Sequence, residues 1–473
     1  MNATGGEATL LWFRNDLRLA DNPALVAALA LGKPIVGLYI HETGADLRSI
    51  GSASRWWLHH SLNAHSQALA TLGIPLEIVV GEADHLIAAA VQQHRVSSVF
   101  WNRRYAPNER AIDAAVKQRL TATGIAARSF SASLLVEPFD ISTGQGRPYS
   151  VFTPFWRALK QRTVPVPVSP PPPAPSPLAR AALDSGYAAP QWSQKLGAHW
   201  SVGEAAAASA LHGFLDASLR DYPQDRDVPA LNATSRLSPH LRFGEIGPRQ
   251  IWHAAMALAV REPDRAEAVD KFLSELAWRD FSYHLLYHRT DIATQPIQPK
   301  FAAMPWRHAP EALSMWQQGK TGFPIIDAGM RQLWATGWMH NRVRMLTASL
   351  LAKNLMIDWR LGEQWFWDTL VDADPASNPA SWQWVAGSGA DAAPYFRIFN
   401  PITQGERFDG HGGYVRKWVP ELTRLPDSAV HNPSAAPPEI LSAAGVELGN
   451  NYPRPIVDLK LSRQRALDAL SSL

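Results

Sequence analysis

The sequence contains no cysteine in 473 residues. Disulfides, thiolate nucleophiles, iron–sulfur clusters and cysteine-based zinc sites all need thiolate sulfur, so these chemistries are excluded. Redox chemistry would therefore need an organic cofactor, and we predict no metal site. No apolar run is long enough to cross a bilayer, and residues 1–9 lack the pattern of a secretory signal. These absences predict a soluble, cytoplasmic protein without a membrane partner.

Neither sign of charge is in large excess, since 45 Lys and Arg residues face 42 Asp and Glu residues. The formal net charge is +3 and the pI is near 9.0, which permits a polyanionic partner without requiring one. Aromatic surface, in contrast, is abundant, because the chain has 19 tryptophans, more than core packing alone usually uses. With 46% hydrophobic and 18% charged residues, the composition is that of a globular protein, and its length favours two or three domains.

The first part of the chain is predicted to be a Rossmann-like α/β domain. Apolar runs that alternate with helical periodicity indicate buried strands of a parallel sheet. These runs lie at 10–13, 36–40, 76–80 and 98–101. The sequence has no G-x-G-x-x-G turn after the first run and no Walker loop, so a standard dinucleotide or triphosphate site is not expected here.

A proline run divides the chain. Residues 164–177 read VPVPVSPPPPAPSP, which cannot form a helix or a central strand and indicates an extended connector. Beyond Trp200 the periodicity is helical, with windows at 202–219, 246–260, 266–287, 325–335, 339–354 and 362–370. We therefore predict an α/β domain at 1–130, a Pro-rich linker at 131–200 and an all-helical domain at 201–473.

Two polar clusters open the helical half. Residues 234–238 place three hydroxyls around a cation before a predicted helix, an arrangement that suits a diphosphate but also a plain helix cap. Glu275 and Trp278 are three residues apart and share a helix face, with a carboxylate beside an aromatic plate. The alternative for this pair is a core tryptophan with a solvated glutamate.

Two further clusters follow. On a helix, Asn341, Arg342 and Met345 would combine amide, cation and soft apolar groups on one side, which suits a base and its phosphate or a buried helix with a charged rim. Residues 372–384 carry acidic, amide and indole groups in what we expect to be a Pro-interrupted loop. Such groups bind the polar edge of a heterocycle, or they form Asx turns on the surface.

Taken in order, these segments resemble the photolyase and cryptochrome family over nearly the whole chain. The match begins with LLWFRNDLRLADNPAL at 10–25, includes TSRLS at 234–238 and WMHNRVRM at 338–345, and continues through SWQWVAGSGADAAPYFRIFNP at 381–401. The resemblance is strongest to bacterial photolyases that repair cyclobutane pyrimidine dimers (CPDs). It implies an α/β amino-terminal antenna domain, a long linker and an all-α domain that holds FAD in a compact U shape.

The resemblance assigns a set of residues to FAD. The implied cofactor-binding residues are Tyr222, Thr234, Ser235, Arg236, Leu237, Ser238, Phe272, Glu275, Arg279, Asn341, Arg344, Asp372, Asp374 and Asn378. Arg344 is expected to pair with Asp372, because a buried charge must be matched. Asn378 would face the ring nitrogen that gains or loses a proton, where a neutral amide can serve several redox states.

The implied activity is light-driven repair of UV-damaged DNA, in which reduced FAD transfers an electron to a flipped-out CPD. The implied DNA-binding residues are Arg226, Glu275, Trp278, Asn341, Arg342, Met345, Trp384, Arg397 and Gln404. Glu275 would stabilise charge developing on the dimer. Trp306, Trp359 and Trp382 match the family's electron relay and complete the catalytic set with Glu275 and Asn378. Stacking of about 1–3 kcal/mol per base would offset the unstacking of the lesion.

Some assignments keep an alternative. Asn108 and Glu109 match the folate-binding form of a light-harvesting site that Trp101 and Tyr105 could line, although residues 291–294 read DIAT where folate-binding relatives supply Cys-Lys. Methenyltetrahydrofolate is therefore favoured, and a deazaflavin is the alternative. A cryptochrome-type blue-light photoreceptor, a (6-4) photolyase and a light-independent DNA-binding flavoprotein compete with CPD repair. Because (6-4) enzymes use a histidine pair where this chain has residues 338–341, CPD repair ranks first. A monomer is expected.

Overall fold

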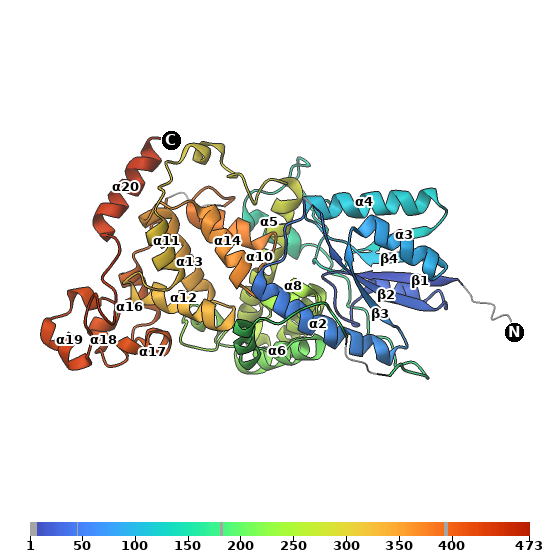
Figure 1. Ribbon diagram of the computed structural model, residues 1–473, viewed down its shortest axis with the longest axis horizontal. Helices are drawn as coiled ribbons and strands as arrows, with labels where there is room; N and C mark the ends of the chain where they lie inside the picture. Colours follow the sequence, from blue (N-terminus) through green and yellow to red (C-terminus); the bar gives the residue numbers. More distant parts are fainter. Residues whose placement is uncertain (1–6, 45, 180–182, 392–395) are drawn as a thin grey trace.

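The computed structural model describes residues 7–44, 46–179, 183–391 and 396–473. The expectation for the first six residues, and positions 392–395 of the last family motif, lie outside these ranges. Figure 1 shows a sheet with its helices at one end of the molecule and a larger helical part at the other. The predicted combination of an α/β domain and an all-α domain is confirmed.

The α/β domain is built on five parallel strands in the order β3-β2-β1-β4-β5. The strands are β1 (Ala8–Phe13), β2 (Ile35–Glu42), β3 (Leu76–Gly81), β4 (Val96–Asn102) and β5 (Ala126–Phe130). The helices are α1 (Pro23–Leu29), α2 (Ser52–Thr71), α3 (Ala83–Gln93) and α4 (Pro107–Ala122). Every residue of β1 is buried. Strand β5 was not predicted, because AARSF is a partly exposed edge strand without an apolar run.

The remainder of the described chain consists of helices joined by irregular segments. Its α-helices are α5 (Phe152–Lys160), α6 (Glu204–Ala217), α7 (Tyr222–Asp225), α8 (Ser238–Phe243), α9 (Pro248–Arg261), α10 (Ala266–His288), α11 (Pro310–Gln317), α12 (Pro324–Thr336), α13 (Asn341–Ser349), α14 (Trp359–Thr369), α15 (Ser377–Ala386), α16 (Pro401–Phe408), α17 (Gly413–Trp418), α18 (Asp427–Val430), α19 (Pro438–Ala444) and α20 (Leu459–Ser471). A π-helical turn at Leu350–Asn354 continues α13. The proline run forms neither helix nor strand and lies against the end of α2, where Ala174 N donates to Thr71 O at 2.9 Å.

The expectation that residues 372–384 form a loop is wrong, because α15 begins at Ser377. Asp374 Oδ1 accepts hydrogen bonds from the amides of Ala376 (2.9 Å) and Ser377 (2.7 Å). It thereby satisfies N–H groups that lack partners at the start of a helix. Pro379 lies in the first turn, where its missing N–H costs little.

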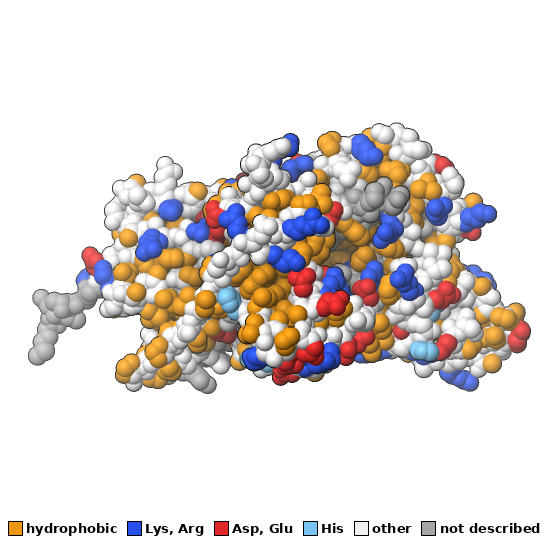
Figure 2. All heavy atoms as spheres, turned by 180° about the vertical axis from the view of Figure 1, so that it is seen from behind, with side chains coloured by type: hydrophobic (Ala, Val, Ile, Leu, Met, Phe, Trp, Pro, Cys, Tyr) orange, Lys and Arg blue, Asp and Glu red, His pale blue; other side chains and the backbone are white. Residues whose placement is uncertain are grey.

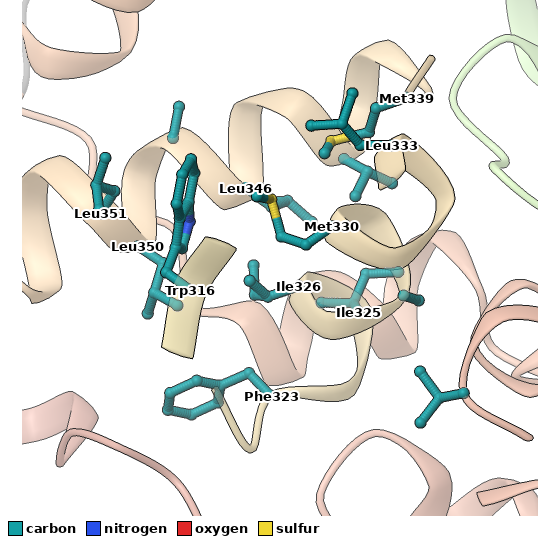
Figure 3. Packing of buried hydrophobic residues seen from close by; sticks show 14 of the residues in the cluster. Trp316, Phe323, Ile325, Ile326, Met330, Leu333, Met339, Leu346, Leu350 and Leu351 are labelled. Atoms are coloured by element: carbon teal, nitrogen blue, oxygen red, sulfur yellow. The ribbon is translucent and has the colours of Figure 1, made fainter. Parts of the chain in front are cut away.

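An apolar core supports the helices that carry the polar clusters. Figure 3 shows side chains from α12 and α13 pointing into the space between these helices. Ile326, Met330 and Leu333 of α12 are at most 1% exposed, and Leu346 of α13 is 2% exposed. Because such cores are close-packed, α13 is held firmly on this side. Its other side is left to present polar residues.

Residues 10–25, the first motif shared with the family, form contacts that join the two domains. Arg18, which is 1% exposed, donates from Nη1 to Gly244 O at 3.0 Å and from Nη2 to Ala132 O at 2.9 Å. Leu17 N donates to Phe243 O at 3.2 Å. Gly244 has a φ of +68°, and a Cβ there would collide with the backbone of Asn15. The end of α8 can therefore approach this segment only if residue 244 is glycine.

We predict that Gly244→Ala weakens this docking. The matched control is Gly124→Ala, because Gly124 also has a positive φ (+78°) but has nothing within 4 Å of an added Cβ. The control should lower the free energy of unfolding by about 1–2 kcal/mol through backbone strain alone. Gly244→Ala should cost about 1–3 kcal/mol more through the collision. Urea denaturation followed by tryptophan fluorescence measures both, and equal losses would contradict the interpretation.

Candidate cofactor and DNA site

A cavity of about 590 Å³ opens in the helical domain, a size typical of cofactor sites. Figure 2 shows this part of the surface hollowed, with apolar side chains inside the hollow and Lys and Arg side chains on several sides of it. The cavity brings together most of the residues assigned by resemblance: Tyr222, Arg226, Ser235, Leu237, Ser238, Phe272, Glu275, Trp278, Arg279, Asn341, Arg342, Arg344, Met345, Asp372, Asp374, Asn378, Trp382 and Trp384.

Other assigned residues do not line the cavity: Thr234, Arg236, Trp306, Trp359, Arg397, Gln404, Asn108 and Glu109. The backbone of Arg236 is left-handed, with a φ of +52°. Its guanidinium lies over the rings of Trp200 (4.2 Å) and Trp338 (5.2 Å). Arg397 is exposed, and Gln404 lies on α16.

The predicted pairing of Arg344 with Asp372 is confirmed. Arg344 Nη2 lies 2.8 Å from Asp372 Oδ2, and Arg344 Nε donates to Met339 O at 2.8 Å. Asp372 is 8% exposed, so its charge needs this partner. Its second oxygen, Oδ1, is buried and has no hydrogen-bond partner within the described ranges.

The amide of Asn378 has a defined orientation. Its Nδ2 donates to Glu363 O (3.1 Å) and to Glu363 Oε1 (2.8 Å). Both partners are acceptors, so the NH₂ group must face them and the carbonyl Oδ1 must face the other way. Glu363 is held in turn by Arg48, which makes two contacts of 2.7 Å to its carboxylate. The α/β domain, which supplies Arg48, therefore helps to set an amide in the helical domain.

Asp374 organises the cavity wall. Its Oδ2 accepts from Tyr283 Oη at 2.7 Å, while Oδ1 caps α15 as described above. Both oxygens are thus engaged with the protein. This network fixes the start of α15, which places Asn378 and Trp382 on the wall.

Arg242, which the sequence did not single out, is a further member of the site. It lines the cavity and is 9% exposed, and its Nε donates to Ala373 O at 2.7 Å. Its Nη1 is buried without a hydrogen-bond partner in the part of the chain that the structure describes. Arg242 lies four residues after the TSRLS motif, and this closeness was the feature of the sequence that could have pointed to it.

These orphaned atoms test whether the cavity suits FAD. Asp372 Oδ1 is a buried acceptor and Arg242 Nη1 a buried donor, and each would cost free energy if left unpaired. An N–H-bearing heterocycle in this cavity would satisfy Asp372 Oδ1, and Arg242 lines both this cavity and a smaller one that also contains Glu109. The apolar walls, which include Phe366 and Val385, suit a flat ring system. The residues present therefore fit FAD.

Glu275 lies on α10 between two cations. Arg226 and Lys271 both contact its Oε1, Lys271 Nζ at 2.9 Å. No hydrogen bond to its Oε2 is found among the residues described. Burial opposes ionisation, but the hydrogen bonds and charges of Arg226 and Lys271 outweigh it and hold the pKa of Glu275 below its usual value. The carboxylate is therefore ionised at neutral pH.

Two arginines assigned to DNA are engaged with carboxylates at the cavity. Arg226 contacts Glu275, and Arg342 makes a salt bridge with Asp227. Asp227 also lines the cavity but was not predicted. These arginines must exchange a carboxylate for a phosphate if they are to contact a DNA strand.

The residues assigned to an antenna pigment, Asn108 and Glu109, lie in the first turn of α4. Asn108 is exposed on α4, and its Nδ2 donates to Asp46 O. Glu109 and Tyr105 line a cavity of about 20 Å³ at the domain interface, room for roughly one water molecule. Trp101 is 1% exposed and packs edge-on against Trp12 at 5.8 Å. It lies in the core of the sheet and does not line that cavity.

A helical domain with this cavity, docked on a parallel α/β domain, defines a two-domain protein built to hold a large polar and aromatic cofactor. The chain belongs to the photolyase and cryptochrome family. A model described as the FAD binding domain of DNA photolyase matches residues 272–472, and a model described as DNA photolyase matches residues 9–176. The first of these contains most of the cavity wall.

Several known proteins are similar over nearly the full chain. The deoxyribodipyrimidine photo-lyase of Agrobacterium fabrum is 48% identical over 471 residues, which cover 98% of each chain. Cryptochrome-1 of Arabidopsis thaliana is 37% identical and covers 99% of this chain and 71% of its own. A crystal structure of a bacterial class III photolyase from Agrobacterium tumefaciens has a TM-score of 0.93 at 46% identity, covering 100% of this chain and 98% of that chain. Within the described ranges, no helix is long and apolar enough to span a membrane.

We predict that the ion pairs of Glu275 make stability depend on pH. Glu275→Gln should lower the free energy of unfolding at pH 7 by about 1–3 kcal/mol, because two cations lose their charged acceptor. Since the folded pKa lies below the unfolded value of about 4.3, this stabilisation is present above that pH. It is lost as the pH falls through the folded pKa. Wild type and variant should therefore converge in acid.

Urea denaturation across this pH range measures the difference. Glu406→Gln is the matched control, because Glu406 is exposed on α16 and has no ion-pair partner among the described residues. Its effect should be small at every pH. A Glu275→Gln loss that is equally large in acid would contradict the ionised state assigned to Glu275.

Proposed function

We propose that this protein repairs CPDs in DNA with blue light, using reduced FAD as its cofactor. The observation that carries the proposal is one cavity shared by the cofactor-type residues Arg344, Asp372 and Asn378 and by a substrate-type group, Glu275 with Trp278. A cofactor and a flipped base would meet there. When bound and excited, reduced FAD supplies the electron that opens the cyclobutane ring of the dimer.

The protein's part in holding FAD follows from its hydrogen-bonding groups. Asp372 Oδ1 can accept from the ring imide, and Arg344 pairs with the other oxygen of this carboxylate. Asn378 presents its carbonyl oxygen, because Glu363 holds its NH₂ group. Arg242 offers a buried cationic donor to an anionic group. Tyr222, Phe272, Arg279 and the 234–238 segment remain proposed contacts.

The dimer must leave the duplex to reach this cavity, at a cost of a few kcal/mol that damage reduces. Glu275 is ionised, so it accepts hydrogen bonds, and its Oε2 is available for a pyrimidine imide N–H. A carboxylate alone would disfavour negative charge on the dimer. We therefore assign the stabilisation of that charge to Arg226 and Lys271, which neutralise Glu275.

The proposed lesion class is supported by the kinds of side chain that line the cavity. No histidine lines the cavity among the described residues. His340 is 2% exposed, and burial lowers its pKa to about 4, so it is neutral at pH 7. Its Nδ1 accepts from the amide of Arg342 at 3.2 Å and caps α13. A CPD needs no such proton donor, whereas the histidine chemistry expected of (6-4) repair would.

Of the three tryptophans proposed for the relay, two are deeply buried and one is partly exposed. Trp382 lines the cavity, Trp359 is 2% exposed, and Trp306 is half-buried against the same apolar cluster. Trp382 packs edge-on to Phe366 at 5.0 Å, and a Cβ on Gly362 would collide with its ring. One tryptophan at the cavity and one that reaches the surface would suit electron delivery from solvent to the cofactor site.

Finer assignments belong to the same proposal. Arg226, Asn341, Arg342, Met345, Trp384, Arg397 and Gln404 would contact the dimer and its strand. A light-harvesting folate or deazaflavin near Asn108 and Glu109 would require the small interface cavity to widen. We further propose a monomer that works in the cytoplasm, with the domain division at 1–130, 131–200 and 201–473.

The proposal is tested with three oligonucleotides that carry a CPD, a (6-4) lesion or no damage. Illumination of the reduced, FAD-loaded protein should restore pyrimidines from the CPD alone, as measured by chromatography. Glu275→Ala should keep its FAD but repair about tenfold less per absorbed photon, because the dimer loses the hydrogen bond that positions its imide beside Arg226 and Lys271. Restoration of the (6-4) lesion, or binding without restoration, would favour the competing functions.

The relay is tested separately by Trp306→Phe. This variant should retain FAD and thermal stability, because Trp306 is only half-buried, but it should lose most of its photoreduction. The control is Trp192→Phe, because Trp192 is 38% exposed and lies outside the proposed relay. Absorbance of oxidised FAD under blue light with an external reductant is the measurement. Unchanged photoreduction in Trp306→Phe would remove this residue from the route.

A further inference from the structure

Trp278 is backed by an aromatic ring from outside the helical domain. Phe152, the first residue of α5, stacks face to face on Trp278 with ring centroids 3.8 Å apart and an interplanar angle of 9°. Phe152 is 8% exposed and does not line the cavity, whereas Trp278 does. Phe281 meets both rings edge-on, at 5.9 Å and 5.8 Å. Phe152 and Phe281 therefore hold the indole of Trp278 in place at the cavity wall.

The position of Phe152 is fixed by contacts on either side of it. Asp391 Oδ2 accepts from the amide of Phe152 at 3.4 Å, which suits a carboxylate at the start of a helix, where N–H groups lack partners. Three residues earlier, the amide of Tyr149 donates to His284 Nε2 at 2.9 Å. Burial lowers the pKa of His284 to about 4, so this ring stays neutral and can accept.

Asp391 also holds the second tryptophan assigned to the dimer. Its backbone carbonyl accepts from Trp384 Nε1 at 3.0 Å. The residue adopts a left-handed backbone with a φ of +53°, a conformation that aspartate, asparagine and glycine tolerate better than other residues. One residue in an uncommon conformation thus contacts both the backbone amide of Phe152, whose ring stacks on Trp278, and the indole of Trp384.

We propose that Phe152 and Asp391 are positioning residues that hold Trp278 and Trp384 as two fixed walls for the flipped dimer. The inference rests on the proposed function and extends it to the chain segment before the proline run. An indole that is already held by stacking or by a hydrogen bond loses little conformational freedom when a base stacks on it. The entropy cost of binding is therefore smaller and the affinity is higher. The segment that joins the domains would therefore contribute to damage recognition.

The first test compares affinities for a CPD oligonucleotide and its undamaged counterpart, measured in the dark by fluorescence anisotropy with the FAD-loaded protein. Phe152→Leu should weaken binding to the dimer about threefold to tenfold, the size expected for one aromatic pair. Binding to undamaged DNA and FAD content should not change. Phe152→Tyr keeps a ring and should restore dimer affinity. Phe130→Leu, which alters an edge-on pair in the α/β domain, should leave it unchanged.

The second test separates the two contacts of Asp391. Asp391→Asn keeps the tolerated backbone conformation and an accepting side-chain oxygen, so it should bind the dimer like wild type. Asp391→Gly keeps the backbone conformation and the carbonyl that holds Trp384 but removes the contact to Phe152. It should reproduce the loss seen with Phe152→Leu. Equal affinity in Asp391→Gly and wild type would remove Asp391 from the arrangement.

The outcomes distinguish this inference from the proposed function. If wild type binds the dimer and undamaged DNA equally, the proposed function fails and the inference fails with it. If wild type discriminates and Trp278→Ala loses discrimination while Phe152→Leu keeps it, only the inference is overturned. A Phe152→Leu loss that is equal for damaged and undamaged DNA, or that Phe130→Leu reproduces, shows a general structural role and also overturns it.

Discussion

Charges removed from water must be matched, and this constraint shapes the whole cavity. Asp372 is paired by Arg344, Glu363 by Arg48, and Glu275 by Arg226 and Lys271. Each pair fixes the direction of a polar atom as well as its charge. The carboxylate of Glu363 orients the amide of Asn378, and the cations on Glu275 Oε1 leave Oε2 for another partner. The geometry offered to a cofactor and a base is thus a consequence of charge matching.

The second constraint is that the helical domain does not complete this geometry alone. Arg48 reaches Glu363 from the α/β domain, and Phe152 reaches Trp278 from the linker. Arg18 joins the domains through backbone carbonyls, and Gly244 permits the close approach that these bonds need. The sheet, which carries no Gly-rich phosphate loop, therefore acts as a support for a site built elsewhere.

The sequence predicted features that depend on local pattern. The long helices were readable because their apolar periodicity is strong, and the Arg344–Asp372 pair followed from charge balance once the family resemblance aligned them. The helix at 377–386 was missed, because two prolines suggested a loop while Asp374 supplied a cap. The pairing of Lys271 with Glu275 was not predicted, although their spacing of four residues on a helix would have indicated it. Arg226 and Phe152 lie 49 and 126 residues from their partners, and nothing local marks such contacts.

Under the proposed function, the ionised state of Glu275 decides which group of a lesion it would bind. A protonated acid could donate to a pyrimidine carbonyl, but the paired carboxylate can only accept, which directs it to an imide N–H. An anion there would repel an electron arriving on the dimer if it stood alone. Because Arg226 and Lys271 both contact its Oε1, the Glu275 carboxylate can accept a hydrogen bond from a base while its negative charge is balanced. If Arg226 moves to a DNA phosphate, as the proposed function requires, Lys271 still pairs with Glu275 and keeps its charge balanced.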